Sequence, residues 1–268
     1  MGVFAASAAA IGALMLPLWV ASALKRDVSI VDAFWGPGFV LVGWVAWGVS
    51  GRPLTLEALL LPAAVSLWGL RLGAYLAWRN WGEPEDARYV AIRKHWPAFW
   101  LTSLGVVFGL QGALMWVVSL PVQLAASEAP PALGWLDALG LAGALLGVAW
   151  ETTADLQLAR FKADPASAGQ VLDTGVWRYS RHPNYFGDFL TWWGLYALAL
   201  GRGAPAWTAV GPVVMSVLLL KVSGVPLLEQ GMQERRPRYA DYVARTSSFF
   251  PWFPKDLEPP ADAAPPRA

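Results

Sequence analysis

The chain has 268 residues and a formal net charge of +1, and its composition is 56% hydrophobic and only 15% charged. So few charges, combined with 17 tryptophans, fall outside the usual range of soluble domains and indicate a membrane protein. The lack of cysteine excludes disulfides and thiolate chemistry. The near-neutral charge argues against nucleic acid as a partner. The two histidines, His95 and His182, do not form a His-x-x-x-His pair, which argues against a metal site.

Seven apolar runs have roughly the 20 residues that a helix needs to cross the hydrocarbon core of a bilayer. We therefore predict an all-α polytopic membrane protein with about seven transmembrane helices in one domain, residues 1–254, and a disordered tail over residues 255–268. The first run lacks a charged segment before it, so we interpret it as a retained helix and not as a signal peptide. The runs are 3–24, 30–50, 56–78, 99–122, 135–158, 185–200 and 206–222.

Lysine and arginine concentrate in alternate connections between these runs. They fall between the first and second runs, the third and fourth, the fifth and sixth, and after the seventh, whereas the other connections contain only Arg52 and Arg202. Because positively charged loops stay in the cytoplasm, this pattern predicts an N-terminus outside and a C-terminus inside.

Polar residues within or beside the runs need an explanation, because they are costly at membrane depth. Asp32 falls one turn into the second run, with Trp35 and Phe39 on the same face. It either complements the helix dipole or pairs with Arg26, or it faces a substrate as an acid beside an aromatic wall. Arg71 lies two helical turns deeper than Arg79, and a buried guanidinium needs a carboxylate or a phosphate.

Two acids and a lysine share one stripe of the fifth run and its extension. Glu151, Asp155 and Lys162 are spaced so that they lie on one helix face. This stripe is either an internal ion network or a face that accepts ribose hydroxyls and pairs with a phosphate, and the spacing alone leaves both open.

The stretch TGVWRYSRHPNYFGDF, residues 174–189, combines arginines with a predicted helix start near His182. Proline suits the first turn of a helix, and a helix N-terminus flanked by arginines is an anion site. Asp188 continues the face of Asn184 at a spacing of four. A basic cytoplasmic loop is the alternative, but such a loop requires neither Asn184 nor Asp188. The aromatic-rich segment after the last run is either a helix on the membrane surface or a lid over a cytoplasmic pocket.

The stretch TGVWRYSRHPNYFGDFLTWWG resembles the C-terminal signature of the steroid 5-alpha reductases and sterol reductases, and residues 25–254 as a whole resemble a bacterial branch of that superfamily. The resemblance is concentrated in the C-terminal part, about residues 135–254. It implies an NADPH-dependent reductase of the bacterial inner membrane. The cofactor would be held on the cytoplasmic side, and a tryptophan-rich bundle would enclose a lipid-like enone that enters from the bilayer.

The resemblance also implies roles for individual residues. A protonated Asp32 would donate a hydrogen bond to the substrate carbonyl, and Tyr75 or a water would deliver the proton to the α-carbon. Val31-Asp32 replaces a Gln-Glu pair and Trp68 replaces a tyrosine of the reductases, which leaves the identity of the enone open. Trp35, Trp68 and Trp192 would contact the substrate. NADPH would be bound by Arg71, Arg79, Asn80, Asp155, Lys162, Arg178, Arg181, His182, Asn184, Tyr185, Asp188, Lys221 and Glu229.

Two other functions remain open. The RHPNY element also resembles membrane methyltransferases of the isoprenylcysteine and phospholipid type, which bind S-adenosylmethionine. A non-enzymatic lipid-binding membrane protein is the third possibility, although it would have little use for Arg71, Asp155 and Asp188 together. The sequence contains no G-x-G-x-x-G motif, which excludes a soluble dinucleotide-binding fold.

Overall fold

The computed structural model describes residues 2–127, 132–222, 236 and 238–256. These residues are helical or irregular and contain no β-strand, so the prediction of an all-α protein is confirmed for the part of the chain that is described. The chain divides into two compact units. Unit 1 comprises Met1–Leu146 and Leu190–Met215, and unit 2 comprises Gly147–Phe189 and Ser216–Ala268.

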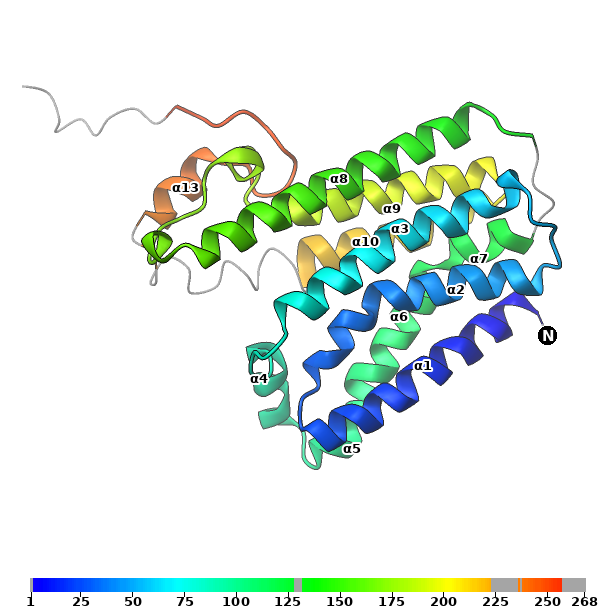
Figure 1. Cartoon of the computed structure of the whole chain (residues 1–268), viewed down its shortest axis with the longest axis horizontal. Helices are drawn as coiled ribbons and strands as arrows, with labels where there is room; N and C mark the ends of the chain where they lie inside the picture. The colour runs from blue at the N-terminus through cyan, green and yellow to red at the C-terminus, as the bar shows by residue number, and fades with distance from the viewer. Residues whose placement is uncertain (1, 128–131, 223–235, 237, 257–268) are drawn as a thin grey trace, which may run out of the picture. The chain divides into compact units, whose positions relative to one another are not determined.

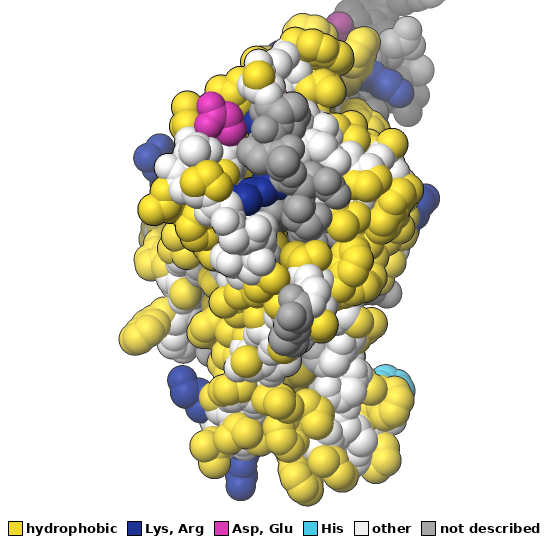
Figure 2. Space-filling view, turned by 90° about the vertical axis from the view of Figure 1, so that its right-hand side faces the viewer, with side chains coloured by type: hydrophobic (Ala, Val, Ile, Leu, Met, Phe, Trp, Pro, Cys, Tyr) yellow, Lys and Arg dark blue, Asp and Glu magenta, His cyan; other side chains and the backbone are white. Residues whose placement is uncertain are grey.

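Unit 1 is built on long apolar helices. Four segments are long and apolar enough to cross a membrane, and they match the first four predicted runs. The segments are Val3–Lys25, Ser29–Val49, Leu56–Arg79 and Phe99–Val118. Helices suit this role because they satisfy all backbone hydrogen bonds within one segment. Hydrophobic side chains are spread over the face shown in Figure 2, with few charged side chains among them, which agrees with a membrane protein.

The elements from α1 to α7 follow one another along the chain in unit 1 (Figure 1). In the second segment a 3-10 turn precedes the α-helix, and in the fourth segment a π-helix interrupts it. Helices α1, α2 and α3 lie side by side in this unit. The bounds are α1 (Val3–Lys25), η1 (Ser29–Phe34), α2 (Trp35–Val49), α3 (Leu56–Arg79), α4 (Ala87–His95), α5 (Phe99–Ser103), η2 (Leu104–Gly109), α6 (Leu110–Val118), α7 (Leu120–Ser127), η5 (Ala206–Ala209) and α10 (Val210–Val217).

Helices α8 (Trp135–Ala163) and α9 (Pro183–Gly201) contribute residues to both units. They coincide with the fifth and sixth predicted runs, and the segment Ala206–Val222 coincides with the seventh as a shorter apolar helix. The total of seven spans and the orientation of the chain stay predictions.

Glycine lets helices of unit 1 approach at backbone distance. A Cβ added at Gly36 of α2 would lie 2.3 Å from the carbonyl oxygen of Gly69 of α3. In the same unit, a Cβ at Gly140 of α8 would lie 2.3 Å from the backbone nitrogen of Leu198 of α9. Small residues at such crossings allow the van der Waals contact that drives helix association in a bilayer.

Unit 2 contains the end of α8, the short turns η3 (Pro165–Ser167) and η4 (Gly175–Arg178), the start of α9, η6 (Leu218–Val222) and α13 (Tyr239–Arg245). One hydrophobic cluster in its core consists of Ala154, Leu172 and Trp177. The indole of Trp177 donates a hydrogen bond to the carbonyl of Ala154 at 3.1 Å. This contact ties the loop before α9 to the end of α8.

Candidate functional site

The predicted site residues fall in both units, and each group is described within its own unit. In unit 2, four predicted or neighbouring polar residues are buried: Glu151 and Asp155 on α8, and His182 and Asp188 at the start of α9. Close packing brings the two helices together here, because a Cβ at Gly187 would lie 2.6 Å from the backbone nitrogen of Glu151. Buried carboxylates are rare unless they interact with a partner or a ligand.

Asn184 connects the two helices of this cluster. Its side-chain amide donates a hydrogen bond to Asp155 Oδ1 at 3.4 Å, so the structure brings together two of the predicted cofactor residues. The amide oxygen of Asn184 is buried and has no hydrogen-bond partner among the described residues. A buried polar atom normally has a partner, so this oxygen is available to a ligand that carries a donor.

The start of α9 is fixed by the segment after α13. Helix α9 begins at Pro183, as predicted. The backbone N–H of Arg181 donates to the carbonyl of Ser247 at 2.8 Å, and the hydroxyl of Ser180 donates to the carbonyl of Phe249 at 2.7 Å. These contacts hold the residues immediately before the helix N-terminus in one conformation.

The other predicted residues of unit 2 differ in exposure. The ring of Tyr185 stacks on that of His182, with centroids 5.9 Å apart. Lys162, Arg178 and Lys221 are exposed. Glu229 lies outside the described residues. Arg181 is half-buried, with buried guanidinium nitrogens. The unit therefore has buried carboxylates on α8 and α9, a half-buried arginine before α9 and exposed cations elsewhere.

Tyr242 of unit 2 lies in the aromatic-rich segment for which we expect a surface helix or a lid. It is buried, and its hydroxyl donates to the carbonyl of Trp177 at 2.6 Å. Burial is the main reason why the pKa of Tyr242 is raised above its ordinary value, and the neighbouring Tyr239 adds to this effect. Its partner lies 65 residues away in the sequence, so the local aromatic pattern does not predict this hydrogen bond.

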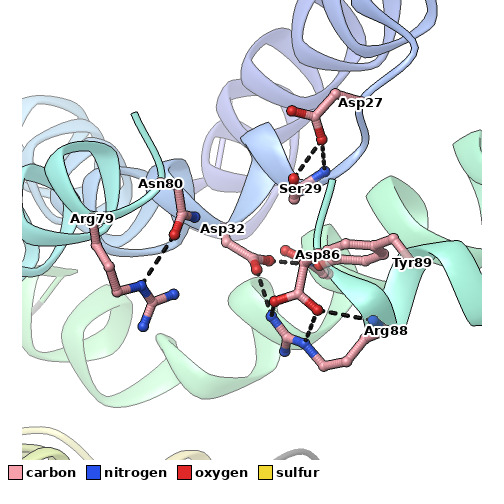
Figure 3. A network of polar contacts seen from close by, with 9 residues as sticks. Asp27, Ser29, Asp32, Arg79, Asn80, Asp86, Arg88 and Tyr89 are labelled. Atoms are coloured by element: carbon pink, nitrogen blue, oxygen red, sulfur yellow. Dashed lines mark hydrogen bonds and ion pairs between the residues drawn. The ribbon is translucent and has the colours of Figure 1, made fainter. Parts of the chain in front are cut away.

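In unit 1, Asp32 is the centre of a polar network (Figure 3). Its Oδ2 accepts a hydrogen bond from the guanidinium of Arg88 at 2.8 Å, and its Oδ1 accepts one from the hydroxyl of Tyr89 at 2.5 Å. The hydroxyl of Tyr89 in turn accepts a hydrogen bond from Gln111 at 3.0 Å. Arg88 also donates to Asp86, the N-cap residue of α4. The network joins η1, α4 and α6.

This geometry corrects two expectations for Asp32. The residue lies in the 3-10 turn Ser29–Phe34 and not one turn into an α-helix, and its ion-pair partner is Arg88 and not Arg26. Both carboxylate oxygens have hydrogen-bond partners, Arg88 and Tyr89, and these contacts do not distinguish an ionised carboxylate from the predicted protonated donor. Arg88 and Tyr89 are functional candidates that have no signal in the local sequence. Asp86 followed by Ala-Arg is a recognisable helix N-cap, but its pairing with the second segment has no local signal.

The electrostatics of α4 follow from this network. Burial, and then the charge of Asp32, raise the pKa of the Tyr89 hydroxyl well above its usual range. Burial alone would lower the pKa of Arg88, but its hydrogen bond to Asp86 and the charge of Asp32 outweigh it and raise that pKa. Burial alone would raise the pKa of Asp86, but the hydrogen bonds from Arg88 lower it. Arg88 is therefore a permanent cation held by two carboxylates.

The predicted cluster on α3 consists of residues spaced along one helix. The guanidinium of Arg71 lies 5.5 Å from the ring centroid of Tyr75, and that of Arg79 lies 5.9 Å from the same ring. Arg79 also donates to the side chain of Asn80 at 3.0 Å. The helical spacing of four residues accounts for these contacts without a ligand.

The three predicted substrate tryptophans take part in one aromatic cluster through Phe39. The ring of Phe39 lies 5.2 Å from that of Trp35, 5.6 Å from that of Trp68 and 4.7 Å from that of Trp192. Trp68 and Trp192 are fully buried, and their indole N–H groups have no hydrogen-bond partner among the described residues. An open apolar groove of about 530 Å³ lies elsewhere in unit 1, along α1 and α6, and these tryptophans do not line it.

Comparison with known proteins assigns the chain to a family. A family model described as "Protein of unknown function (DUF1295)" matches residues 18–246. The uncharacterised protein C594.04c of Schizosaccharomyces pombe is 25% identical over 265 residues, which cover 87% of this chain and 75% of the yeast protein. No solved structure matches the chain significantly.

Proposed function

We propose that this chain, which belongs to the DUF1295 family, is a membrane-embedded reductase that uses NADPH to reduce the activated C=C bond of an apolar enone. The observation that carries the proposal is the buried cluster of unit 2, where Asn184 at the N-terminus of α9 is hydrogen-bonded to Asp155 of α8. The resemblance of residues 174–194 to the steroid 5-alpha and sterol reductases indicates NADPH as the ligand.

The residues of this cluster fit a dinucleotide. The buried amide oxygen of Asn184 has no hydrogen-bond partner in the described chain and would accept one from a carboxamide or a hydroxyl. The buried carboxylates of Asp155 and Asp188 are acceptors suited to ribose hydroxyls. The exposed cations Lys162 and Arg178, and the N-terminus of α9, are suited to phosphates.

In the proposed reaction, NADPH would supply the hydride to the β-carbon of the enone, and the enone carbonyl would need a hydrogen-bond donor. Because both oxygens of Asp32 have hydrogen-bond partners, we assign it a positioning role. It orients Arg88, whose remaining N–H groups are the donors for a carbonyl oxygen on which negative charge develops. Tyr75 or a water remains the proposed donor of the proton to the α-carbon, and the packed aromatic rings around Phe39 exclude bulk water.

The distribution of charge along the sequence supports a cytoplasmic position for the cofactor. Arg160, Lys162, Arg178 and Arg181 all lie in the connection before α9 or near it, and basic connections remain in the cytoplasm. We propose a bacterial inner membrane as the location.

A ligand titration tests the proposal directly. Purified protein in detergent would be melted with NADPH, NADH or S-adenosylmethionine, comparing the unaltered chain with Asn184→Ala. A ligand at 100 times its dissociation constant stabilises the folded state by about 2.7 kcal/mol through mass action, so Tm should rise with NADPH and this rise should be lost in Asn184→Ala. Thr153→Ala is the matched control, because Thr153 is an exposed residue of α8 whose hydroxyl contacts only its own helix.

The same titration separates the alternatives. A rise with S-adenosylmethionine alone would overturn the reductase proposal and favour a membrane methyltransferase. No rise with any of the three ligands would favour a protein without these cofactors. A rise with NADPH that survives in Asn184→Ala would place the cofactor elsewhere in the chain.

A further inference from the structure

We propose that residues 249–255 of unit 2 form an interfacial anchor, which inserts the side chains of Trp252 and Phe253 among the headgroups of a bilayer that contains anionic phospholipid. This inference concerns a surface outside the candidate site and stands whether or not the protein is a reductase. It commits to a lipid surface as the partner.

The first observation is the exposure of two large aromatic side chains. Trp252 is 74% exposed and Phe253 is 77% exposed, whereas Phe249 of the same segment is only 3% exposed. Phe249 packs against Phe189, with ring centroids 5.6 Å apart. One end of the segment therefore belongs to the core of unit 2, and the other presents aromatic rings to its surroundings.

The second observation is that the backbone holds these rings outward. The N–H of Trp252 donates to the carbonyl of Tyr179 at 2.9 Å, and the N–H of Lys255 donates to the carbonyl of Arg245 at 2.9 Å. Pro251 and Pro254 flank the two aromatic residues, and proline restricts the backbone on both sides. The segment is fixed at two points, so the exposed rings are a stable feature of the unit.

The third observation is the charge of the surface of unit 2. Three acids, Glu151, Asp155 and Asp188, are buried, so they add little to the exposed charge. Among the described residues of this unit, the exposed bases outnumber the exposed acids by six to three. The bases are Arg160, Lys162, Arg178, Lys221, Arg238 and Lys255, and the acids are Asp164, Asp241 and Asp256.

The headgroup region of an anionic bilayer would accommodate both the exposed aromatic rings and the exposed bases of unit 2. Tryptophan and phenylalanine partition to the boundary between headgroups and acyl chains, where their rings are partly dehydrated. Basic side chains nearby are attracted to anionic lipid within a Debye length of the surface. Two of the bases flank the aromatic pair along the contacts just described: Lys255 follows it in sequence, and Arg178 adjoins Tyr179, whose ring lies 6.0 Å from that of Phe253.

The absence of cysteine from the chain permits a clean test. Full-length protein with Phe253→Cys would carry one spin label and be reconstituted into bilayers of phosphatidylcholine with phosphatidylglycerol. Collisions with oxygen, which partitions into lipid, would be compared with collisions with a water-soluble nickel chelate. The control is Asp241→Cys, an exposed position on α13 of the same unit.

We expect oxygen to dominate at position 253 and nickel to dominate at position 241, with the ratio of the two differing severalfold. Omitting phosphatidylglycerol, or introducing Lys255→Glu, should shift position 253 towards water. Dominant nickel collisions at both positions would overturn the proposal. Protection of position 253 from both reagents would also overturn it, because the segment would then contact protein.

A second measurement uses the unaltered chain and does not depend on how a variant folds. Phospholipid carrying a photoactivated carbene precursor near its glycerol backbone would be crosslinked to the reconstituted protein, and the modified peptides identified by mass spectrometry. Modification should concentrate on residues 250–255. Modification confined to the membrane-spanning segments would contradict the proposal.

Discussion

Replacing Asp32 with asparagine separates the two kinds of contact that its carboxylate makes. An amide oxygen can still accept from Tyr89, but it has no charge for Arg88, which donates at 2.8 Å. A hydrogen bond to a charged group contributes about 1.5–3 kcal/mol. The side chain of Arg88 is 42% exposed, so solvent screens the pair and we expect a loss of roughly 1 kcal/mol in the free energy of unfolding.

Denaturant titration in detergent would measure this loss. Asp27→Asn is the control, because the carboxylate of Asp27 accepts from Ser29, two residues away. It should cost less than Asp32→Asn. Combining Asp32→Asn with Arg88→Gln should cost less than the sum of the single changes, since both remove one interaction. Strictly additive losses would show that the pair is not coupled.

Alkaline pH should destabilise the protein through Tyr89. Burial and the charge of Asp32 raise the pKa of this phenol in the folded state above its unfolded value, which is about 10. The protonated phenol therefore stabilises the fold fully below about pH 10, and this contribution is lost as the pH rises above that value towards the folded pKa. Melting at a series of pH values should show a smaller alkaline loss in Tyr89→Phe. Equal pH slopes in both proteins would contradict this role.

Among the helices, the crossing of α8 and α9 within unit 1 offers a sharp comparison of two glycines. A Cβ at Gly194 would lie 2.3 Å from the backbone nitrogen of Ala144, and backbone cannot move aside as a side chain can. Overpacking a core costs roughly 1–3 kcal/mol. We therefore expect Gly194→Ala to lower the free energy of unfolding by roughly this amount or more. A Cβ at Gly143 meets its nearest atom at 3.4 Å, an ordinary contact, so Gly143→Ala should be tolerated. The melting temperature of Gly194→Ala should be lower than that of Gly143→Ala. Similar melting temperatures would show that the two helices separate easily.

The sequence predicts the positions of helices better than it predicts the contacts between them. The start of α9 at Pro183 and the four apolar segments follow from local signals, because proline and hydropathy act over a few residues. The partners of Asp32 do not, since Arg88 and Tyr89 lie 56 and 57 residues away. Arg202 lies in the connection after α9, and it is buried and makes two hydrogen bonds to Asp137, 65 residues away. Pairings across such distances depend on helix packing, which sequence periodicity does not specify.

In the described part of the chain, four segments are long and apolar enough to cross a membrane, and α8 and α9 are not among them. Helix α8 carries Asp137, Glu151 and Asp155, all of them buried in the protein. A helix that shields its acids inside a bundle can cross a bilayer with a lower mean hydropathy than a helix that faces lipid on all sides. We therefore still predict seven spans, with the N-terminus outside and the C-terminus in the cytoplasm.

Cysteine labelling tests this orientation without background, because the chain has no cysteine of its own. Leu54→Cys lies in the connection before α3 and Glu83→Cys in the connection before α4, and both positions are exposed. Arg79 ends α3, and Arg88, Arg93 and Lys94 follow it in α4, whereas the connection before α3 contains only Arg52. The positive-inside rule therefore places position 83 in the cytoplasm and position 54 outside. A maleimide that cannot cross membranes should label position 54 in intact spheroplasts, and position 83 only after they are permeabilised. The reverse labelling pattern would show that the chain has the opposite orientation. The basic residues before α9 would then lie outside the cytoplasm, where NADPH is not available to them.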